Sequence, residues 1–155
     1  MIVTFCGHSD FIRNDEYERR LLAFFEEKIG NDAVDFYLGG YGAFDSFAYS
    51  CAKKYKATHP RASLVFITPY IIVEYQERLK EIEKMYDAVI YPELENIPLR
   101  FAIVHRNRFM VQKSDIVVAY VGRRYGGAYK TYKYAVGKGK EIFNLFDTDC
   151  VTAVK

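Results

Sequence analysis

Several features that mark other classes of protein are missing from this 155-residue chain. No apolar run approaches the roughly 20 residues that a membrane-spanning helix needs. The three cysteines, Cys6, Cys51 and Cys150, form no C-x-x-C pair, so neither a disulfide framework nor a zinc site is indicated. The sequence also lacks internal repeats and low-complexity segments. We therefore expect reduced, mostly buried cysteines, no metal site and no membrane partner.

A strong excess of charge is missing too. The formal net charge is +2, and the basic residues are scattered among acidic ones. A DNA-binding surface usually concentrates lysine and arginine on one face, so we do not expect DNA binding. Residues 1–5 carry neither the basic flank nor the cleavage site of a signal peptide, and we expect a cytoplasmic protein.

The composition that is present is that of one packed domain covering residues 1–155. Half of the residues are hydrophobic and 27% are charged, and tyrosine is common at 14 residues, with no tryptophan. Hydrophobic periodicity predicts strands and helices in alternation. The expected strands are Ile2–Cys6, Asp35–Leu38, Ser63–Thr68, Ala88–Tyr91, Ile116–Val121 and Glu141–Phe146. The expected helices are Glu16–Lys28, Phe44–Tyr55, Glu74–Tyr86, Phe101–Lys113 and Tyr129–Gly137.

This alternation predicts a three-layer, Rossmann-like α/β fold. It would contain a mainly parallel sheet of about six strands with helices on both faces. The segment Tyr70–Tyr91 fits a lid, a core element or a subunit contact, and the sequence does not choose among them.

Three glycine-rich turns follow expected strands and are the main pointer to function. They are Cys6-Gly7-His8, Gly39-Gly40-Tyr41-Gly42 and Gly126-Gly127. Glycine lets the backbone approach a ligand closely, and a helix that follows presents free N–H groups to an anion. In a parallel sheet all three turns fall at the carboxyl edge, where ligands bind. They meet there if the strands that precede them are central.

The second turn is followed by Asp45, which has two interpretations. It is placed to stabilise the start of the next helix electrostatically. Beside a phosphate site it would instead accept hydrogen bonds from ribose or act as a base or nucleophile. His8 is a candidate ligand contact, and a hydrogen-bonded turn residue is the alternative.

Arg106-Asn107-Arg108 places two arginines and an amide in an expected helix. Arginine beside an amide suits phosphate binding, although both arginines also fit ordinary surface positions. Positions two apart cannot share a helix face, so only one of the two faces the site. In the third turn, Gly126-Gly127 with Thr131 forms a possible anion site. It matches neither the P-loop pattern nor G-x-G-x-x-G.

These residues resemble the SLOG superfamily, the Rossmann-like fold shared by the SMF/DprA DNA-processing proteins and the Lonely Guy phosphoribohydrolases. The similarity is closest to its small, single-domain YpsA-like members. The residues that carry it, besides the first two glycine turns, are Arg106-Asn107-Arg108-x-Met110-Val111, Ser114-Asp115, Gly126-Gly127-Ala128-x-x-Thr131-x-x-x-Ala135, Gly137-Lys138-Gly139-Lys140, Ile142 and Asn144-Leu145.

The resemblance implies a site for a nucleotide or nucleotide-derived ligand in a homodimer, with no required cofactor. The family's contact positions correspond to Gly7, Gly39, Gly40, Gly42, Arg106, Asn107, Gly126, Gly127 and Thr131. The phosphoribohydrolase members carry a glutamate after P-G-G-x-G-T. Here Ala128-Tyr129-Lys130-Thr131-Tyr132-Lys133 follows the two glycines, with no carboxylate.

Two functions from different classes follow. The first is a module that binds or senses a small nucleotide without consuming it. The second is an enzyme that cleaves an N-glycosidic bond, a nucleoside monophosphate phosphoribohydrolase or a nucleoside deoxyribosyltransferase, with Asp45 as the catalytic carboxylate. The missing glutamate favours binding over catalysis.

Overall fold

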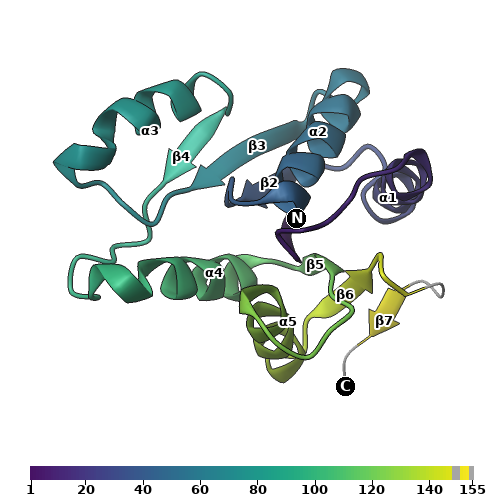
Figure 1. Cartoon of the computed structure of the whole chain (residues 1–155). Coiled ribbons are helices and arrows are strands. Elements are labelled where there is room, and N and C mark those ends of the chain that lie inside the picture. The colour runs from purple at the N-terminus through teal and green to yellow at the C-terminus, as the bar shows by residue number, and fades with distance from the viewer. Residues whose placement is uncertain (148–150, 154–155) are drawn as a thin grey trace.

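The computed structural model describes residues 1–147 and 151–153, so Cys150 lies outside the described part of the chain. Strands and helices alternate along it (Figure 1). The strands are β1 (Ile2–Gly7), β2 (Val34–Leu38), β3 (Ala62–Ile67), β4 (Ala88–Ile90), β5 (Ile116–Tyr120), β6 (Glu141–Asn144) and β7 (Val151–Ala153). The helices are α1 (Asp15–Lys28), α2 (Ala43–Thr58), α3 (Gln76–Glu83), α4 (Ala102–Lys113) and α5 (Gly127–Gly137). Short 3-10 turns, η1 (Val73–Tyr75) and η2 (Leu99–Phe101), precede α3 and α4.

The strands form one sheet in the order β4-β3-β2-β1-β5-β6-β7. The first six strands in sequence are parallel to their neighbours, and only β7 runs antiparallel, beside β6. Because β1 lies between β2 and β5, the strand order reverses at β1. The expected three-layer, mainly parallel α/β fold is confirmed, and the three strands that carry the glycine turns are neighbours.

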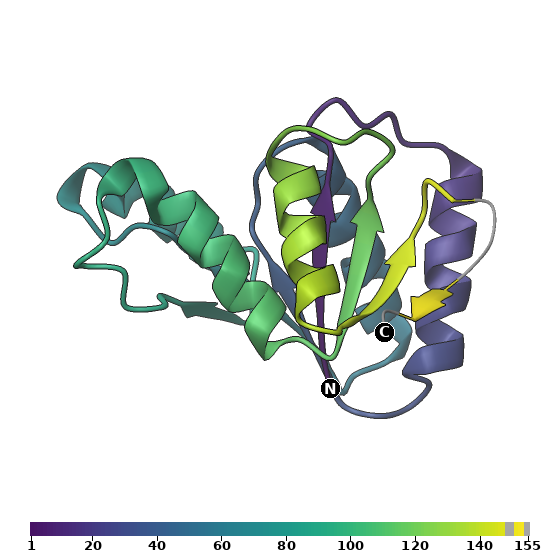
Figure 2. The ribbon, with the colours of Figure 1, turned by 90° about the horizontal axis from the view of Figure 1, so that it is seen from below.

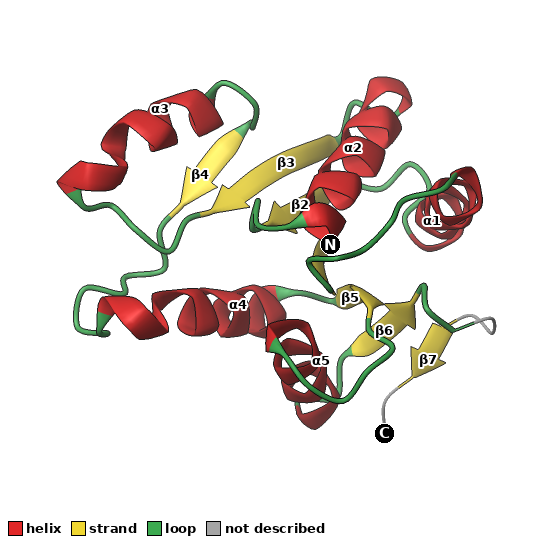
Figure 3. Ribbon diagram, viewed as in Figure 1, coloured by secondary structure: helices red, strands yellow, loops and turns green. Residues whose placement is uncertain are grey.

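Helices cover both faces of the sheet (Figures 1 and 3). α1 and α2 lie on one face, and α4 and α5 lie on the other. Seen from below, α5 lies alongside β1 and β5 (Figure 2), and it contacts both strands. This arrangement brings the amino ends of α2 and α5 to the carboxyl edge of the central strands.

Side-chain alternation along β1 explains the two halves of the core. Val3 and Phe5 face the α1–α2 layer and join a phenylalanine-rich cluster. Cys6 faces the opposite layer with smaller side chains such as Val117 and Ala135. The two buried, free cysteines, Cys6 and Cys51, therefore belong to different halves of the core.

The segment Tyr70–Tyr91 forms η1, α3 and the sheet-edge strand β4, which makes it an edge element of the fold. Its helix is shorter than the predicted Glu74–Tyr86. Asp87 pairs with β3, because its N–H donates to the Leu64 carbonyl and its carboxylate accepts the Leu64 N–H. Residues 84–87 therefore form the turn that brings Asp87 to β3, and α3 ends at Glu83.

The short antiparallel strand β7, which pairs with β6, was not predicted from the sequence. No helix in the described part of the chain is long and apolar enough to cross a membrane.

Candidate functional site

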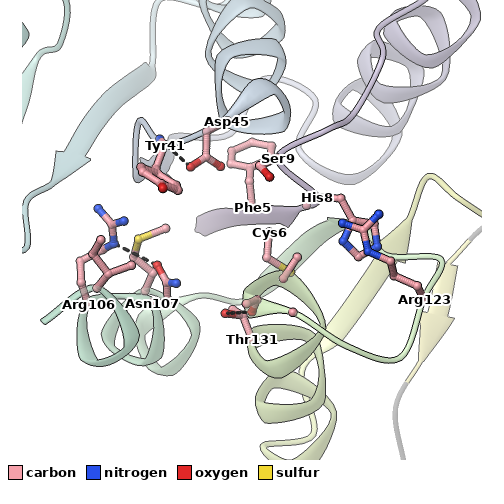
Figure 4. Close-up of a pocket in the computed structure, with 16 residues that line it drawn as sticks. Phe5, Cys6, His8, Ser9, Tyr41, Asp45, Arg106, Asn107, Arg123 and Thr131 are labelled. Carbon is pink, nitrogen blue, oxygen red and sulfur yellow. Dashed lines mark hydrogen bonds between the residues drawn. The ribbon is translucent and has the colours of Figure 1, made fainter. Parts of the chain in front are cut away.

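A cavity of about 260 Å³ opens at the carboxyl edge of β1, where the strand order reverses. Its walls come from the end of β1 and the loop after it, the β2–α2 turn, helix α4, and the β5–α5 loop (Figure 4). In open α/β sheets this is the position at which ligands bind. The cavity therefore brings together side chains that are widely separated in the sequence.

Residues 8 and 9, which follow β1, form hydrogen bonds to the start of α2 and to the β5–α5 loop, the segments that carry the other two glycine turns. The Gly122 N–H, after β5, donates to Nε2 of His8 at 3.1 Å. The Ala43 N–H, at the start of α2, donates to the Ser9 carbonyl at 3.4 Å. The three turns thus form one connected structure around the cavity.

Two helices begin at this cavity with nearly identical backbone geometry. Gly42 precedes α2 with φ 91° and ψ 174°, and Gly126 precedes α5 with φ 92° and ψ 174°. Only glycine adopts this region readily. Neither helix has a side-chain cap, whereas in α1 the Asn14 side chain accepts the Tyr17 N–H. The uncapped N–H groups and the positive dipole ends of both helices make the cavity favourable for an anion.

Arg106 on α4 is the buried cation of the site, with 2% of its surface exposed. Its Nη1 group donates to the carbonyls of Gly39 (3.0 Å) and Ile67 (2.8 Å), which end β2 and β3. Its Nε group donates to Oδ1 of Asn107 at 2.9 Å (Figure 4). Burial lowers the pKa of Arg106 and Asp45 opposes that shift. An arginine keeps its charge even so.

The structure separates the two arginines of the Arg106-Asn107-Arg108 motif. Arg106 lines the cavity, and exposed Arg108 stacks against Tyr134 of α5, with 5.4 Å from its Cζ to the ring centre. A Cβ atom on Gly39 would lie 3.0 Å from Cζ of Arg106, so this glycine makes room for the guanidinium.

Asp45 lines the cavity from the first turn of α2, and it also has the structural role that the sequence suggested. Its Oδ2 accepts the Tyr41 N–H at 2.9 Å and so stabilises the turn before the helix. Burial raises the pKa of its carboxyl to about 6, although the Tyr41 N–H and the Arg106 cation oppose the shift. No hydrogen bond to Oδ1 is found within the described residues.

His8 is buried and holds two loops together. The backbone N–H of His8 donates to the Tyr120 carbonyl at 3.2 Å. Its ring Nε2 accepts the Gly122 N–H, so the proton of the neutral ring lies on Nδ1. Burial lowers the pKa of His8, and the Arg123 cation lowers it further. The neutral form therefore dominates at pH 7.

Arg123 is a cavity residue that sequence reasoning missed. Its Nη1 group donates to both carboxylate oxygens of Asp10, at 3.0 and 3.2 Å. Its Nε group is buried and has no hydrogen-bond acceptor within residues 1–147 and 151–153. Position 123 follows β5 at the carboxyl edge, and that placement was the only sequence signal that could have found it.

Most of the sequence-predicted site residues are brought together. Those that line the cavity are Gly7, His8, Asp45, Arg106, Asn107, Gly126, Gly127 and Thr131. Gly39, Gly40 and Gly42 shape the β2–α2 turn and are not among the lining residues. Gly40 has φ 65°, and a Cβ there would lie 2.8 Å from Phe66. The Thr131 hydroxyl donates back to the Gly127 carbonyl at 3.1 Å.

Two other features limit the chemistry that the site can perform. Burial raises the pKa of the Cys6 thiol to about 12, so this lining cysteine stays protonated and is a poor nucleophile. Within the described ranges no group of three histidine, cysteine or acidic residues is placed to hold a metal ion.

Comparison with known proteins gives matches by structure alone. No family model matches the sequence, and no curated protein matches it. The fold resembles that of DNA processing protein A (DprA) from Helicobacter pylori, with a TM-score of 0.60 and 16% identity over 93% of this chain. It also resembles DprA from Streptococcus pneumoniae, with a TM-score of 0.62 and 16% identity over 92% of this chain. The matched regions span 64% and 49% of those two proteins.

The comparison corrects the expectation that DNA binding can be dismissed. The H. pylori protein is described as having a single-stranded DNA binding mode, and it shares this fold. The expectation used a net charge of +2, which averages over the whole surface. Binding depends on the local potential, and two helix N-termini and two arginines concentrate positive potential at this cavity.

Proposed function

We propose that the cavity binds the phosphate group of a nucleotide or nucleotide-derived small molecule, and that the protein holds or senses this ligand without consuming it. The observation that carries the proposal is the pair of uncapped helices, α2 and α5, that begin at glycines with matching φ and ψ beside one cavity. Convergent backbone N–H groups of this kind bind phosphate.

The charges around the cavity support an anionic ligand. Arg106 and Arg123 are its lining cations, and Asp45 is the lining carboxylate. With a carboxyl pKa of about 6, Asp45 is still mostly ionised at pH 7, and the two arginines and the helix N-termini offset its repulsion of phosphate. The resemblance to SLOG proteins of the YpsA-like type supports the same ligand class, and the DprA-like fold is consistent with that assignment.

The start of α5 favours binding over catalysis. Its first turn, Gly127-Ala128-Tyr129-Lys130, contains no carboxylate that could assist cleavage of a glycosidic bond. Asp45 also accepts a hydrogen bond from its own turn. A ligand held by backbone N–H groups and arginines would thus be retained intact.

Isothermal titration calorimetry tests this proposal with four ligands: inorganic phosphate, adenosine 5′-monophosphate, adenosine and a single-stranded oligothymidylate. We expect the monophosphate to bind at least about tenfold more tightly than adenosine, which corresponds to about 1.4 kcal/mol. Equal affinity for both would contradict a phosphate site. The oligothymidylate shows whether the bound phosphate belongs to a free nucleotide or to a nucleic-acid strand. If it binds more tightly than the monophosphate, and its affinity falls steeply with salt, the ligand is a nucleic-acid strand.

Two glycine variants of α5 locate the site. Gly127→Ala adds a methyl group at the cavity and should weaken monophosphate binding. Gly137→Ala is the matched control at the other end of α5, and it should bind normally. Neither added Cβ meets an atom within 4 Å, so the fold accommodates both. Equal affinities in the two variants would place the phosphate elsewhere.

Cleavage of an N-glycosidic bond is the second candidate, because Asp45 lines the cavity with a carboxyl pKa of about 6. The ionised carboxylate would form a bond to the anomeric carbon while the glycosidic bond breaks. The base would leave with the bonding electron pair and take a proton from water. Water would then hydrolyse the sugar ester.

Incubation with nucleoside monophosphates, followed by chromatography for free base, tests this second candidate. Base release that is lost in Asp45→Asn would establish the enzyme and overturn the binding-only proposal. Asparagine keeps an oxygen that can accept the Tyr41 N–H, so this variant preserves the turn.

A further inference from the structure

A second cavity, of about 430 Å³, adjoins the first at the carboxyl edge of the sheet. The two cavities share His8 and Arg123 in their walls. The second extends from these residues toward the loop that precedes α1 and toward Phe146, which follows β6. The two cavities are therefore adjacent, with His8 and Arg123 between them.

Three aromatic side chains, Tyr17, Tyr120 and Phe146, stand among the polar residues that line this second cavity. Tyr120 lies at the centre, with the rings of Tyr17 and Phe146 edge-on to it, each with 5.5 Å between ring centres. The hydroxyl oxygens of Tyr17 and Tyr120 are 3.5 Å apart. Half of the surface of Phe146 is exposed, so a flat ligand can reach its ring. Rings arranged in this way stack on other aromatic rings, and tyrosine hydroxyls add hydrogen bonds at the edges.

The packing of Phe146 depends on Gly122, which lines the second cavity beside it. A Cβ atom on Gly122 would lie 2.2 Å from Cε2 of Phe146, so any larger residue there would displace this ring. The N–H of Gly122 is also the group that donates to His8. The phenylalanine wall and the histidine between the cavities are therefore positioned by one residue.

The shared wall also retains donors for a ligand. Asp10 binds Nη1 of Arg123, and the guanidinium stacks over Tyr125 with 5.1 Å from its Cζ to the ring centre. These contacts fix its orientation, and its buried Nε has no acceptor among the described residues. A guanidinium donor of this kind matches a phosphate oxygen or the acceptor edge of a base.

From these observations we infer that the second cavity is a nucleobase subsite. It takes the base of the nucleotide whose phosphate lies at the start of α2 and α5, with the sugar over His8 and Arg123. This inference rests on the proposed function and deepens it, because it identifies a base-bearing ligand rather than a simple phosphate or sugar phosphate. Aromatic walls continuous with a phosphate site fit a nucleobase better than an aliphatic group.

The test compares ribose 5-phosphate with the four common nucleoside monophosphates by titration calorimetry. We expect at least one nucleotide to bind about tenfold or more tightly than ribose 5-phosphate. In Phe146→Ala that advantage should fall to less than about threefold, with the affinity for ribose 5-phosphate unchanged. Phe101→Ala is the matched control, because Phe101 is similarly exposed and is not among the residues that line either cavity.

A measurement on the unaltered protein keeps the test independent of how Phe146→Ala folds. In saturation-transfer NMR, irradiation of the protein's aromatic protons should transfer to the base protons of the bound nucleotide more strongly than to its ribose protons. If all nucleotides bind like ribose 5-phosphate and the base protons show no such transfer, the base subsite is overturned and the phosphate site stands. If neither ligand class binds, both inferences fall together.

Discussion

Arg106 and Asp45 are oppositely charged groups that face the same cavity and act on each other electrostatically. Each also has structural partners: two strand-end carbonyls for the arginine, and the N–H of its own turn for the aspartate. Their side chains therefore serve the fold and the site together, and substitutions at either position should change both stability and binding.

Replacing Arg106 with alanine should destabilise the protein and weaken ligand binding. The carbonyls of Gly39 and Ile67 lose a buried donor, which costs about 1–3 kcal/mol for an unsatisfied group. We also expect nucleotide affinity to fall by more than about tenfold. Urea unfolding and titration calorimetry measure the two effects. Arg108→Ala, on an exposed site, is the control and should change stability by less than about 0.5 kcal/mol. Unchanged stability in Arg106→Ala would show that the carbonyl contacts are dispensable.

Asp45 should make stability depend on pH. Its folded pKa of about 6 lies above the ordinary value of 3.8, so folding favours the protonated form. The stability that it contributes is full below pH 3.8 and is lost as pH rises through about 6. The unfolding free energy of the unaltered protein, minus that of Asp45→Asn, should therefore fall between these values and level off above them. A difference that stays flat from pH 4 to pH 7 would contradict the shift in the Asp45 pKa.

At the scale of elements, the site depends on how two helices begin. α2 and α5 use a glycine with positive φ in place of a capping side chain, so no side chain caps their first turns, although the Ala43 N–H of α2 donates to the Ser9 carbonyl. Helix α1, which is capped by Asn14, shows that the chain caps a helix conventionally elsewhere. The missing caps cost helix stability at the two positions where an anion can restore it.

Gly126→Ala should therefore destabilise the protein through its backbone alone. Its φ of 92° suits glycine, and a Cβ atom would meet no atom within 4 Å, so strain without a clash is expected. The cost should be about 1–3 kcal/mol in urea unfolding. Gly127→Ala, one residue later and with no positive φ, is the comparison and should keep its stability. Equal stability of the two variants would show that the turn readily adopts another conformation.

At the scale of the whole molecule, the strand order places every part of the site at one edge. β2, β1 and β5 are neighbours, so the three turns that follow them converge, and the residues after β1 form hydrogen bonds to the start of α2 and to the β5–α5 loop. A ligand in this cavity would contact both helical layers, because α2 lies on one face and α4 and α5 lie on the other (Figure 1). Binding should therefore stabilise the whole fold rather than a single loop.

A nucleotide at 100 times its dissociation constant should raise the unfolding free energy by about 2.7 kcal/mol. For a chain of this length, the midpoint of thermal unfolding should rise by about 5–10 °C. Scanning fluorimetry with a solvatochromic dye measures this rise. The same nucleotide at the same concentration should shift Gly127→Ala much less. Equal shifts in the two proteins would mean that the ligand stabilises the protein from a different site.

The sequence by itself determined the alternation of strands and helices and the position of the glycine turns. These follow from local periodicity and backbone freedom: a turn after a parallel strand must lie at the carboxyl edge. Gly7, Gly126 and Gly127 were identifiable for that reason, and Arg106 was identifiable from the Arg106-Asn107-Arg108 motif. Only the tertiary structure decided that β1 lies between β2 and β5, that Arg106 rather than Arg108 enters the cavity, and that Arg123 pairs with Asp10. Those outcomes depend on contacts between residues far apart in the chain, which local patterns do not encode.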